Sequence, residues 1–419
     1  MAALRSTGAS ASSGRRPASS STRAASRTQP AVLLGGGIVA LSAARALGTH
    51  GVAVCVLGNA ATDLVKHSRF CTSFVDLGIG DGVQERWSRW LSSSPLGEAV
   101  LFPCCDDGLE LVARERGALT RQGYLPMEAN DEVVLAMLDK LDSYALAQQA
   151  GVAVPRHFAL DDLAHLDSAL AESGVGFPCA LKPLHSHLFA RHYGGDQKVF
   201  LARDRDELKA AAARTAAHRL RMMVTEVIPG PEDSYHALHT YLDEHGEPLA
   251  QLTKRKLRQY PVGFGMGTYH VTDWNEEVAR VGLQFCRGVG IVGVANPEFK
   301  RDSRDGQLKL IECNHRFTMS NELLRRAGVN LPLLAYDRLL GLPVHVHNGY
   351  RRAVYQWSPA QDLRAFAESR RRGQLSLLRW LRSLLHRRKY LTAVDRGDLA
   401  PLLVGLCSRA RRMIARGSG

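Results

Sequence analysis

The chain has 419 residues, 45% of them hydrophobic, and a formal net charge of +13. This length and apolar content can build two or three domains with their own cores. Two segments hold the positive charge, since residues 1–30 carry about +5 and residues 361–419 about +10, which leaves the rest near −2. The charge pattern argues against a nucleic-acid-binding body, and without an apolar run of about 18 residues we expect no membrane-spanning helix.

Residues 1–30 are rich in Ser, Ala and Arg and contain no acid. This composition is typical of a disordered extension, which we favour over an organelle-targeting segment, and the polar residues after Arg15-Arg16 do not fit an export signal. Eight cysteines are scattered without a CxxC pair. They predict a reducing, cytoplasmic compartment, no disulfide framework and no zinc site.

The folded part is expected to begin as a βαβ unit. The pattern predicts a strand, a glycine turn, a helix and a second strand at residues 31–34, 35–37, 38–48 and 52–57. The glycine turn lacks the full Gly-x-Gly-x-x-Gly and a following acid, so it is weak evidence for NAD or FAD. A further strand at 99–103 leads to Asp106 and Asp107, which either bind a ligand at the strand's carboxyl end or cap the next helix.

Residues 177–183 and 185–197 point to an anionic ligand. A strand is predicted at 177–183, after an amphipathic helix at 139–147, and Lys182 interrupts the apolar run of this strand. A lysine at such a buried edge needs an anionic partner, and a nucleotide phosphate supplies one. Residues 185–197 predict a mobile glycine loop that folds over a triphosphate and ends at Lys198. The histidine spacings of this loop fit no standard zinc pattern.

The next stretch predicts antiparallel strands. A strand at 222–228 runs into a Pro-Gly-Pro turn, and strands are expected at 235–242 and 249–254. The basic residues of 253–258, beside the glycines of 263–267, are consistent with an anionic acceptor or phosphoryl group in a cleft. A solvated basic edge strand is the alternative.

The most informative stretch is a predicted β-hairpin at residues 295–317. Two alternating apolar runs, separated by an Asp/Ser/Gly turn, place Glu298 and Glu312 on adjacent strands facing the same side. With Asn314 they offer the oxygen ligands that suit Mg²⁺, with Mn²⁺ as an alternative, and Arg316 could grip a phosphoryl group nearby. The alternative is an ordinary hairpin with exposed acids.

At this hairpin the residues Asn296-Pro297-Glu298-Phe299-Lys300 and Ile311-Glu312-Cys313-Asn314-His315-Arg316 resemble the metal-binding end of the ATP-grasp superfamily. The resemblance spans about residues 31–345. The order of residues 314–332 is similar to the D-aspartate ligase and carboxylate–amine ligase branch, apart from His315, where the family usually carries Pro. The fold implied is α/β with α+β, built from an N-terminal βαβ domain, a lid and a mixed-sheet domain.

The resemblance also implies binding roles. Lys140, Lys182 and Lys198 would contact the ATP phosphates. The backbone around Glu226, Val227 and Ile228 would read the adenine edge, and Glu232 or Asp233 would hold the ribose. The metal ligands would be Glu298, Glu312 and Asn314, and Lys182 and Arg316 would stabilise the transferred group. Four regions are expected. They are an extension at 1–30, a pre-ATP-grasp domain at 31–130, an ATP-grasp domain at 131–345 with a lid at about 150–225, and a basic helical tail at 346–419.

The tail lies outside the resemblance, so its structure is predicted from its own residues. Residues 375–385 alternate leucines with arginines, which predicts a basic amphipathic helix. We favour a helix packed on the body with a solvated charged face over one lying on anionic lipid, and we expect that residues 361–419 can be removed without loss of nucleotide binding.

The function expected is an ATP-dependent ligase that activates a carboxylate as an acyl phosphate and joins it to an amine. Its ligands would be ATP, Mg²⁺, a carboxylate and an amine, without nucleic acid, while a homodimer and a peripheral membrane contact stay open. The alternatives are a carbamoyl-phosphate synthase-like enzyme, a carboxylase, or a catalytically idle ATP-binding module.

Overall fold

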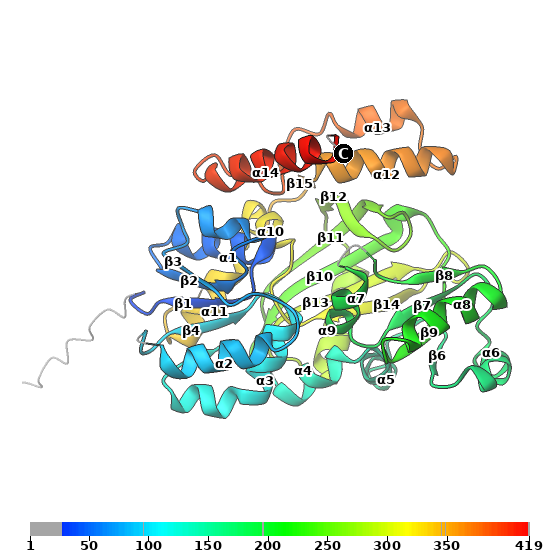
Figure 1. Ribbon diagram of the computed structural model, residues 1–419, viewed down its shortest axis with the longest axis horizontal. Helices are drawn as coiled ribbons and strands as arrows, with labels where there is room; N and C mark the ends of the chain where they lie inside the picture. The colour runs from blue at the N-terminus through cyan, green and yellow to red at the C-terminus, as the bar shows by residue number, and fades with distance from the viewer. Residues whose placement is uncertain (1–26, 95, 195–196, 345, 348, 418–419) are drawn as a thin grey trace, which may run out of the picture.

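The computed structural model describes residues 27–94, 96–194, 197–344, 346–347 and 349–417. Most of the expected N-terminal extension, residues 1–26, lies outside this range. The remaining part of that extension contacts the body, because Arg27 forms an ion pair with Asp337 at 2.7 Å. Three β-sheets of five, four and seven strands make up the described chain (Figure 1).

The five-stranded sheet is parallel, in the order β3-β2-β1-β4-β5. Its strands are β1 (Ala31–Leu34), β2 (Val54–Gly58), β3 (Ser73–Asp76), β4 (Val100–Pro103) and β5 (Leu125–Pro126). Its helices are α1 (Gly37–Gly48), α2 (Val83–Ser93) and α3 (Asp106–Arg121), with a 3-10 turn at Leu64–His67. Every residue of β1, β2 and β4 is buried, which explains why these strands are continuous apolar runs.

The four-stranded sheet is antiparallel, in the order β6-β9-β7-β8. Its strands are β6 (His157–Leu160), β7 (Cys179–Pro183), β8 (Phe200–Ala202) and β9 (Met222–Glu226). Its helices are α6 (Leu166–Ser173), α7 (Ser186–Tyr193) and α8 (Arg205–Ala216), with a 3-10 turn at Leu163–His165. The prediction of a glycine loop at 185–197 is wrong over most of this range, because residues 186–193 form α7. This helix packs Phe189 against Tyr193 and Phe200.

Helices α4 (Asp131–Leu138) and α5 (Lys140–Gln149) connect the first two sheets. The seven-stranded sheet has the order β14-β13-β10-β11-β12-β15-β16. Its strands are β10 (Tyr235–Leu242), β11 (Pro248–Tyr260), β12 (Met266–Thr272), β13 (Gly293–Arg301), β14 (Leu308–Asn314), β15 (Tyr355–Trp357) and β16 (Lys389–Leu391), and a 3-10 turn covers Glu232–Ser234. Helix α9 (Glu276–Val289) buries Val278 and Phe285 against Phe299 and Leu310 of this sheet.

Two helices that follow the hairpin join the large sheet to the parallel one. Helices α10 (Asn321–Ala327) and α11 (Leu331–Leu339) share one hydrophobic core with α1 and β1. Within it the rings of Phe102 and Phe317 lie 5.3 Å apart. This packing brings the end of β14 next to the end of β4, which positions the site described below.

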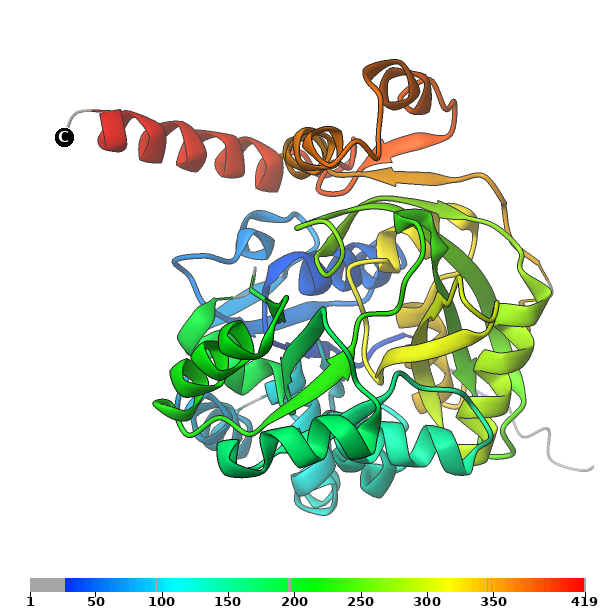
Figure 2. The same cartoon turned by 90° about the vertical axis from the view of Figure 1, so that its right-hand side faces the viewer.

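The C-terminal segment differs from the helical tail expected at 346–419. It contributes the strands β15 and β16 to the large sheet, as well as helices α12 (Pro359–Arg371), α13 (Leu377–Ser383) and α14 (Ala400–Gly417). Both views show these helices as a layer along one edge of the molecule (Figures 1 and 2). No helix within the described ranges is both long enough and apolar enough to cross a membrane.

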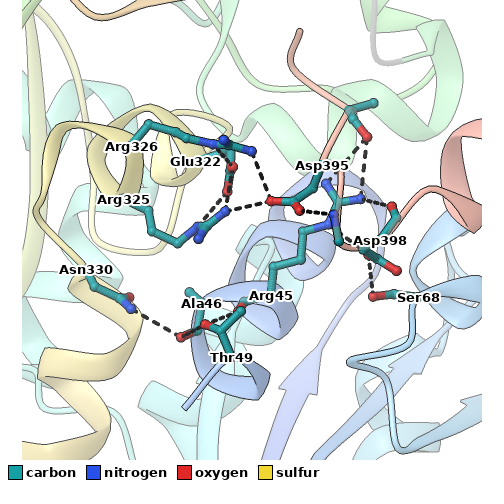
Figure 3. A network of polar contacts seen from close by, with 12 residues as sticks. Arg45, Ala46, Thr49, Ser68, Glu322, Arg325, Arg326, Asn330, Asp395 and Asp398 are labelled. Atoms are coloured by element: carbon teal, nitrogen blue, oxygen red, sulfur yellow. Dashed lines mark hydrogen bonds and ion pairs between the residues drawn. The ribbon is translucent and has the colours of Figure 1, made fainter. Parts of the chain in front are cut away.

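Two buried ion pairs tie this segment to the body. Asp362 binds Arg258 at 2.7 Å, and Asp398 binds Arg45 of α1 at 2.8 Å with both side chains almost fully buried (Figure 3). Removal of residues 361–419 would therefore delete a strand and leave two buried arginines without partners. The expectation that this segment is dispensable does not fit the structure.

Candidate active site

The three sheets meet at a cavity of about 480 Å³. Its walls come from the loop after β4, from β7 and the residues after β9, and from strands β11 to β14. Most of the predicted site residues line it. They are Lys140, Lys182, Lys198, Glu226, Val227, Ile228, Glu298, Glu312, Asn314 and Arg316.

The predicted hairpin is formed by β13 and β14. Glu298 lies opposite Glu312 and Asn296 lies opposite Asn314 in an antiparallel register, with a bulge after Glu298. Glu298, Glu312 and Asn314 line the cavity, whereas Asn296 is buried and donates a hydrogen bond to the Leu238 carbonyl. The pairing of the two glutamates across adjacent strands, inferred from the sequence, is therefore present.

The carboxylates of both glutamates face the cavity and accept no hydrogen bond from the described residues. Glu298 lies 4.0 Å from the Lys254 ammonium and 3.8 Å from that of Lys256, beyond hydrogen-bond distance. Burial raises the pKa of Glu298, but these lysines and Arg316 outweigh it and hold the pKa below its usual value. Across the described residues, no side chain or backbone group donates a hydrogen bond to the Glu298 or Glu312 carboxylate.

This donor set fits a magnesium ion. Two carboxylates with free oxygen lone pairs, and one amide, are a partial oxygen shell of the kind that Mg²⁺ completes with water and substrate phosphates. Within the described part of the chain, no cluster of three or more His, Cys, Asp or Glu side chains could hold a metal ion. A metal ion held by Glu298, Glu312 and Asn314 would need further ligands from substrate phosphate or water.

The lysines that the sequence predicts to contact phosphate line the same cavity. Lys140, at the start of α5, donates a 2.7 Å hydrogen bond to the Ser186 hydroxyl. Burial lowers the pKa of Lys140 and, together with the nearby Lys140 charge, lowers the pKa of Lys182 to about 8. Lys198 is exposed at the rim. A bound polyphosphate would relieve the repulsion between these ammonium groups.

Arg316 is held in place by the first turn of helix α3. Its Nε donates a 2.6 Å hydrogen bond to Asp106, and Asp107 binds Arg191 of α7 at 2.6 Å. Both aspartates lie in the first turn of α3, whose N-cap is Cys105, so neither caps the helix as the alternative interpretation proposed. Asp106 lines the cavity and orients the guanidinium at the end of β14.

The predicted adenine-reading strand is partly engaged elsewhere. The Glu226 carboxylate accepts hydrogen bonds from the Arg156 backbone at 2.9 Å and from Arg304 at 2.7 Å, and the Glu226 amide donates to the Arg156 carbonyl at 2.9 Å. The two predicted ribose-binding acids are outside the cavity lining. Glu232 accepts from the Gly263 amide at 3.3 Å, and Asp233 pairs with Arg255 at 3.2 Å. Their assignment to the ribose stays a prediction.

The sequence assigned no individual role to several cations of the cavity. Lys254 and Lys256 alternate along β11 and face inward, and Lys300 joins Lys256 over the Tyr235 ring at 4.8 and 4.7 Å. The alternation of residues 254–258 was the available signal. It fails at Arg258, because the strand bulges between Lys256 and Arg258. Gln259 therefore lines the cavity, whereas Arg258 does not and pairs with Asp362 instead.

His315 departs from the Pro usual at its position without disturbing the site. It is buried at 3% exposure, and burial lowers its pKa to about 4, so the imidazole is neutral. Its neighbours Asn314 and Arg316 still line the cavity.

Comparisons with known proteins support the fold. No protein-family model matches the chain. D-aspartate ligase of Enterococcus faecium (strain Aus0004) is 26% identical over 251 residues, which are 58% of this chain and 59% of the relative. The aligned region thus spans less than two thirds of that relative's length.

Solved structures align over more of the chain. L-amino acid ligase from Bacillus licheniformis has a TM-score of 0.61 at 15% identity, over 79% of this chain and 80% of its own. The biotin carboxylase domain of Hydrogenobacter thermophilus 2-oxoglutarate carboxylase was solved with MgADP and bicarbonate. It has a TM-score of 0.61 at 16% identity, over 77% of this chain and 73% of its own. An ADP complex of N5-carboxyaminoimidazole ribonucleotide synthetase has a TM-score of 0.59 at 14% identity, over 76% of this chain and 79% of its own. The chain has the ATP-grasp fold and resembles the carboxylate–amine ligases of that superfamily.

Proposed function

We propose that the protein is an ATP-dependent ligase that joins a carboxylate to an amine and releases ADP and phosphate. The observation that supports this most is the pairing of Glu298 with Glu312 in one cavity with Lys140, Lys182 and Arg316. Two acids to which no described residue donates a hydrogen bond, facing several buried cations, are suited to a metal-bound polyphosphate. Similarity to D-aspartate ligase and L-amino acid ligase supports the amide-forming class.

The reaction would proceed in two balanced steps. A carboxylate oxygen of the first substrate attacks the γ-phosphorus of ATP, and the bond between that phosphorus and the ADP oxygen breaks. The amine nitrogen of the second substrate then attacks the acyl carbon, phosphate leaves, and the nitrogen loses a proton. No protein nucleophile is required.

The chain's own residues would bind and orient the reactants. Lys140, Lys182 and Lys198 hold phosphate oxygens, and the backbone of 226–228 faces the adenine. Glu298, Glu312 and Asn314 would hold Mg²⁺ or Mn²⁺, which neutralises charge on the phosphates. Arg316, fixed by Asp106 at 2.6 Å, stabilises negative charge on the transferred phosphoryl group.

The test is an ADP-release screen of the purified chain with MgATP and pairs of amino acids and small carboxylates. We expect ADP and phosphate to form only when a matching acid and amine are both present. AMP and pyrophosphate would overturn the acyl-phosphate mechanism. ADP release that needs bicarbonate instead of another carboxylate would point to a carboxylase or a carbamoyl-phosphate-forming enzyme, and nucleotide binding without turnover under every condition would indicate an idle module.

A further inference from the structure

The C-terminal layer exposes an unusual number of leucines. Fourteen large hydrophobic residues are exposed among the described residues, and the eight that lie beyond residue 360 are all leucines. They are Leu363, Leu377, Leu378, Leu381, Leu385, Leu399, Leu403 and Leu406. Scattered single leucines are normal on a protein surface, but a gathering on one layer marks an interaction surface.

Helix α13 and the turn after it form the centre of this feature. No residue of α13 is buried, and Leu385 reaches 79% exposure. We define the Leu/Arg surface as the exposed leucines and arginines of this short stretch, apart from Arg388, whose guanidinium donates to the Arg352 carbonyl. Its members are Leu377, Leu378, Leu381, Leu385, Arg379, Arg382 and Arg387. Among the described residues, no carboxylate lies within ion-pair distance of these three guanidinium groups.

The acids of the same segment are turned toward the protein. Residues 361–419 contain four acids. Asp362 and Asp398 occupy the buried pairs with Arg258 and Arg45. Asp395 binds both Arg325 and Arg326 of α10 at 2.9 Å, as Figure 3 shows. The last acid, Glu368 of α12, pairs with Arg372, the residue after that helix, at 2.5 Å and accepts a hydrogen bond from the Val262 amide. Because every acid is already paired, the outward charge of the layer is positive.

We propose that the Leu/Arg surface docks the protein onto an anionic lipid membrane. Leucines beside uncompensated arginines are the combination that interfacial segments use, since the apolar chains enter the acyl boundary and the cations bind lipid phosphates. A second copy would place like charges opposite one another, and a nucleic acid would leave the leucines in water. Helices α12, α13 and α14 share one edge of the body in both views, so the layer can meet a flat surface (Figures 1 and 2).

The layer is also rigid enough to orient the enzyme. Trp380 of α13 donates to Asp362 at 2.9 Å and stacks on Phe366 of α12 at 4.7 Å, while β16 is part of the large sheet. The cavity residues are not members of the Leu/Arg surface. Docking would therefore fix the orientation of the body without covering the candidate active site with these side chains.

Vesicle sedimentation of the full chain tests the proposal. We expect binding to vesicles that mix phosphatidylcholine with phosphatidylglycerol and little binding to phosphatidylcholine alone. Arg379→Gln, Arg382→Gln and Arg387→Gln together should weaken binding on the order of 10²-fold, at about fivefold for each cation. Leu378→Gln, Leu381→Gln and Leu385→Gln together should weaken it by about tenfold or more without changing charge.

A matched control separates location from net charge. Arg89→Gln, Arg121→Gln and Arg280→Gln together remove the same charge from exposed positions elsewhere and should leave vesicle binding within about twofold. Thermal midpoint and ATP binding should be unchanged in all three variants. Equal binding to neutral vesicles, no sedimentation of the wild type, or an equal loss in the control would overturn the proposal. So would a concentration-dependent dimer abolished by the leucine variant, which would assign the surface to a second copy.

Discussion

Two groups of carboxylates in this molecule are held in opposite ways. Glu298 and Glu312 face a cavity, and no described residue donates a hydrogen bond to either carboxylate, although two lysines lie 3.8 and 4.0 Å from Glu298. Asp362 and Asp398 are buried under the C-terminal layer and accept short hydrogen bonds from arginines at 2.7 and 2.8 Å. Asp398 accepts two further bonds, from Ser68 and from the Arg69 amide.

The difference separates function from assembly. An acid whose lone pairs are all used stabilises one arrangement of the chain and has nothing left for a ligand. An acid held ionised by cations at a distance keeps its lone pairs for an incoming metal. Substitutions in the two groups should therefore change different observables, and this can be measured.

Asp398→Ala should have the largest effect. It leaves Arg45 buried without a counter-charge, for which the expected loss is about 3–5 kcal/mol of unfolding free energy. Urea unfolding of the variant beside the wild type measures this. The double variant Arg45→Met with Asp398→Leu, which removes both charges, should recover most of the loss. If Asp398→Ala costs less than about 1 kcal/mol, the pair is not the tie that we describe.

Glu312→Gln should affect turnover instead. It keeps the shape of the side chain and removes one charge that would offset the metal, so kcat should fall roughly 10²-fold or more while the thermal midpoint stays within a degree or two. ATP binding should weaken less, because Lys140 and Lys182 remain. Steady-state ADP release and a thermal melt, run side by side, give the comparison.

The control for that variant is Asp305→Asn in the turn of the same hairpin. The Asp305 side chain is 40% exposed. Asp302 of the same turn is fully buried and binds Arg304 and Lys309. Asp302 would therefore test stability rather than catalysis. Near-full activity of Glu312→Gln, or inactivity of Asp305→Asn, would show that the metal assignment is wrong.

Lys182 should give ATP binding a pH dependence. Its pKa is lowered to about 8 by burial and by Lys140, so the free enzyme loses this cation as pH rises through 8. ATP affinity should then fall by up to about tenfold per pH unit, and Lys182→Arg, which stays charged, should remove the dependence. Titration calorimetry across pH 7 to 9.5 measures the ATP affinity, and an affinity that does not change with pH contradicts the prediction. Between the pKa of Lys182 in the folded chain and its pKa in the unfolded chain, the unfolded chain binds more protons, so the free energy of unfolding should rise with pH there.

An exposed ion pair should have the smallest effect. Arg203 and Glu207 lie 3.1 Å apart with the arginine side chain 76% exposed. Arg203→Ala should cost only about 0.2–1 kcal/mol, and salt should reduce that further. Urea unfolding at low and high salt measures it. A loss as large as that of Asp398→Ala would mean that burial does not decide the strength of these pairs.

Local spacing predicted part of the candidate site, and the family resemblance supplied the other residues. The register that pairs Glu298 with Glu312 follows from alternation on two strands joined by a short turn, and the ATP-grasp fold followed from the motifs around it. Lys182 was found because one cation in an apolar strand is conspicuous in the sequence. The glycine turn after β1 and a helix at 38–48, observed as Gly37–Gly48, were likewise predicted, since glycine and the apolar period act over a few residues.

Contacts between distant segments decided the rest. Asp398 lies 353 residues from Arg45, and Asp362 lies 104 from Arg258, so no local pattern could show that the basic segment completes the large sheet. The same holds for Asp106, which orients Arg316 from 210 residues away, and for Arg258, whose alternation with Lys254 and Lys256 looked equivalent until Asp362 neutralised it. The sequence by itself determined which residues could bind a phosphate or a metal. The tertiary structure decided which of them remain free to do so, because a charge is available to a ligand only where the packed chain has not already paired it.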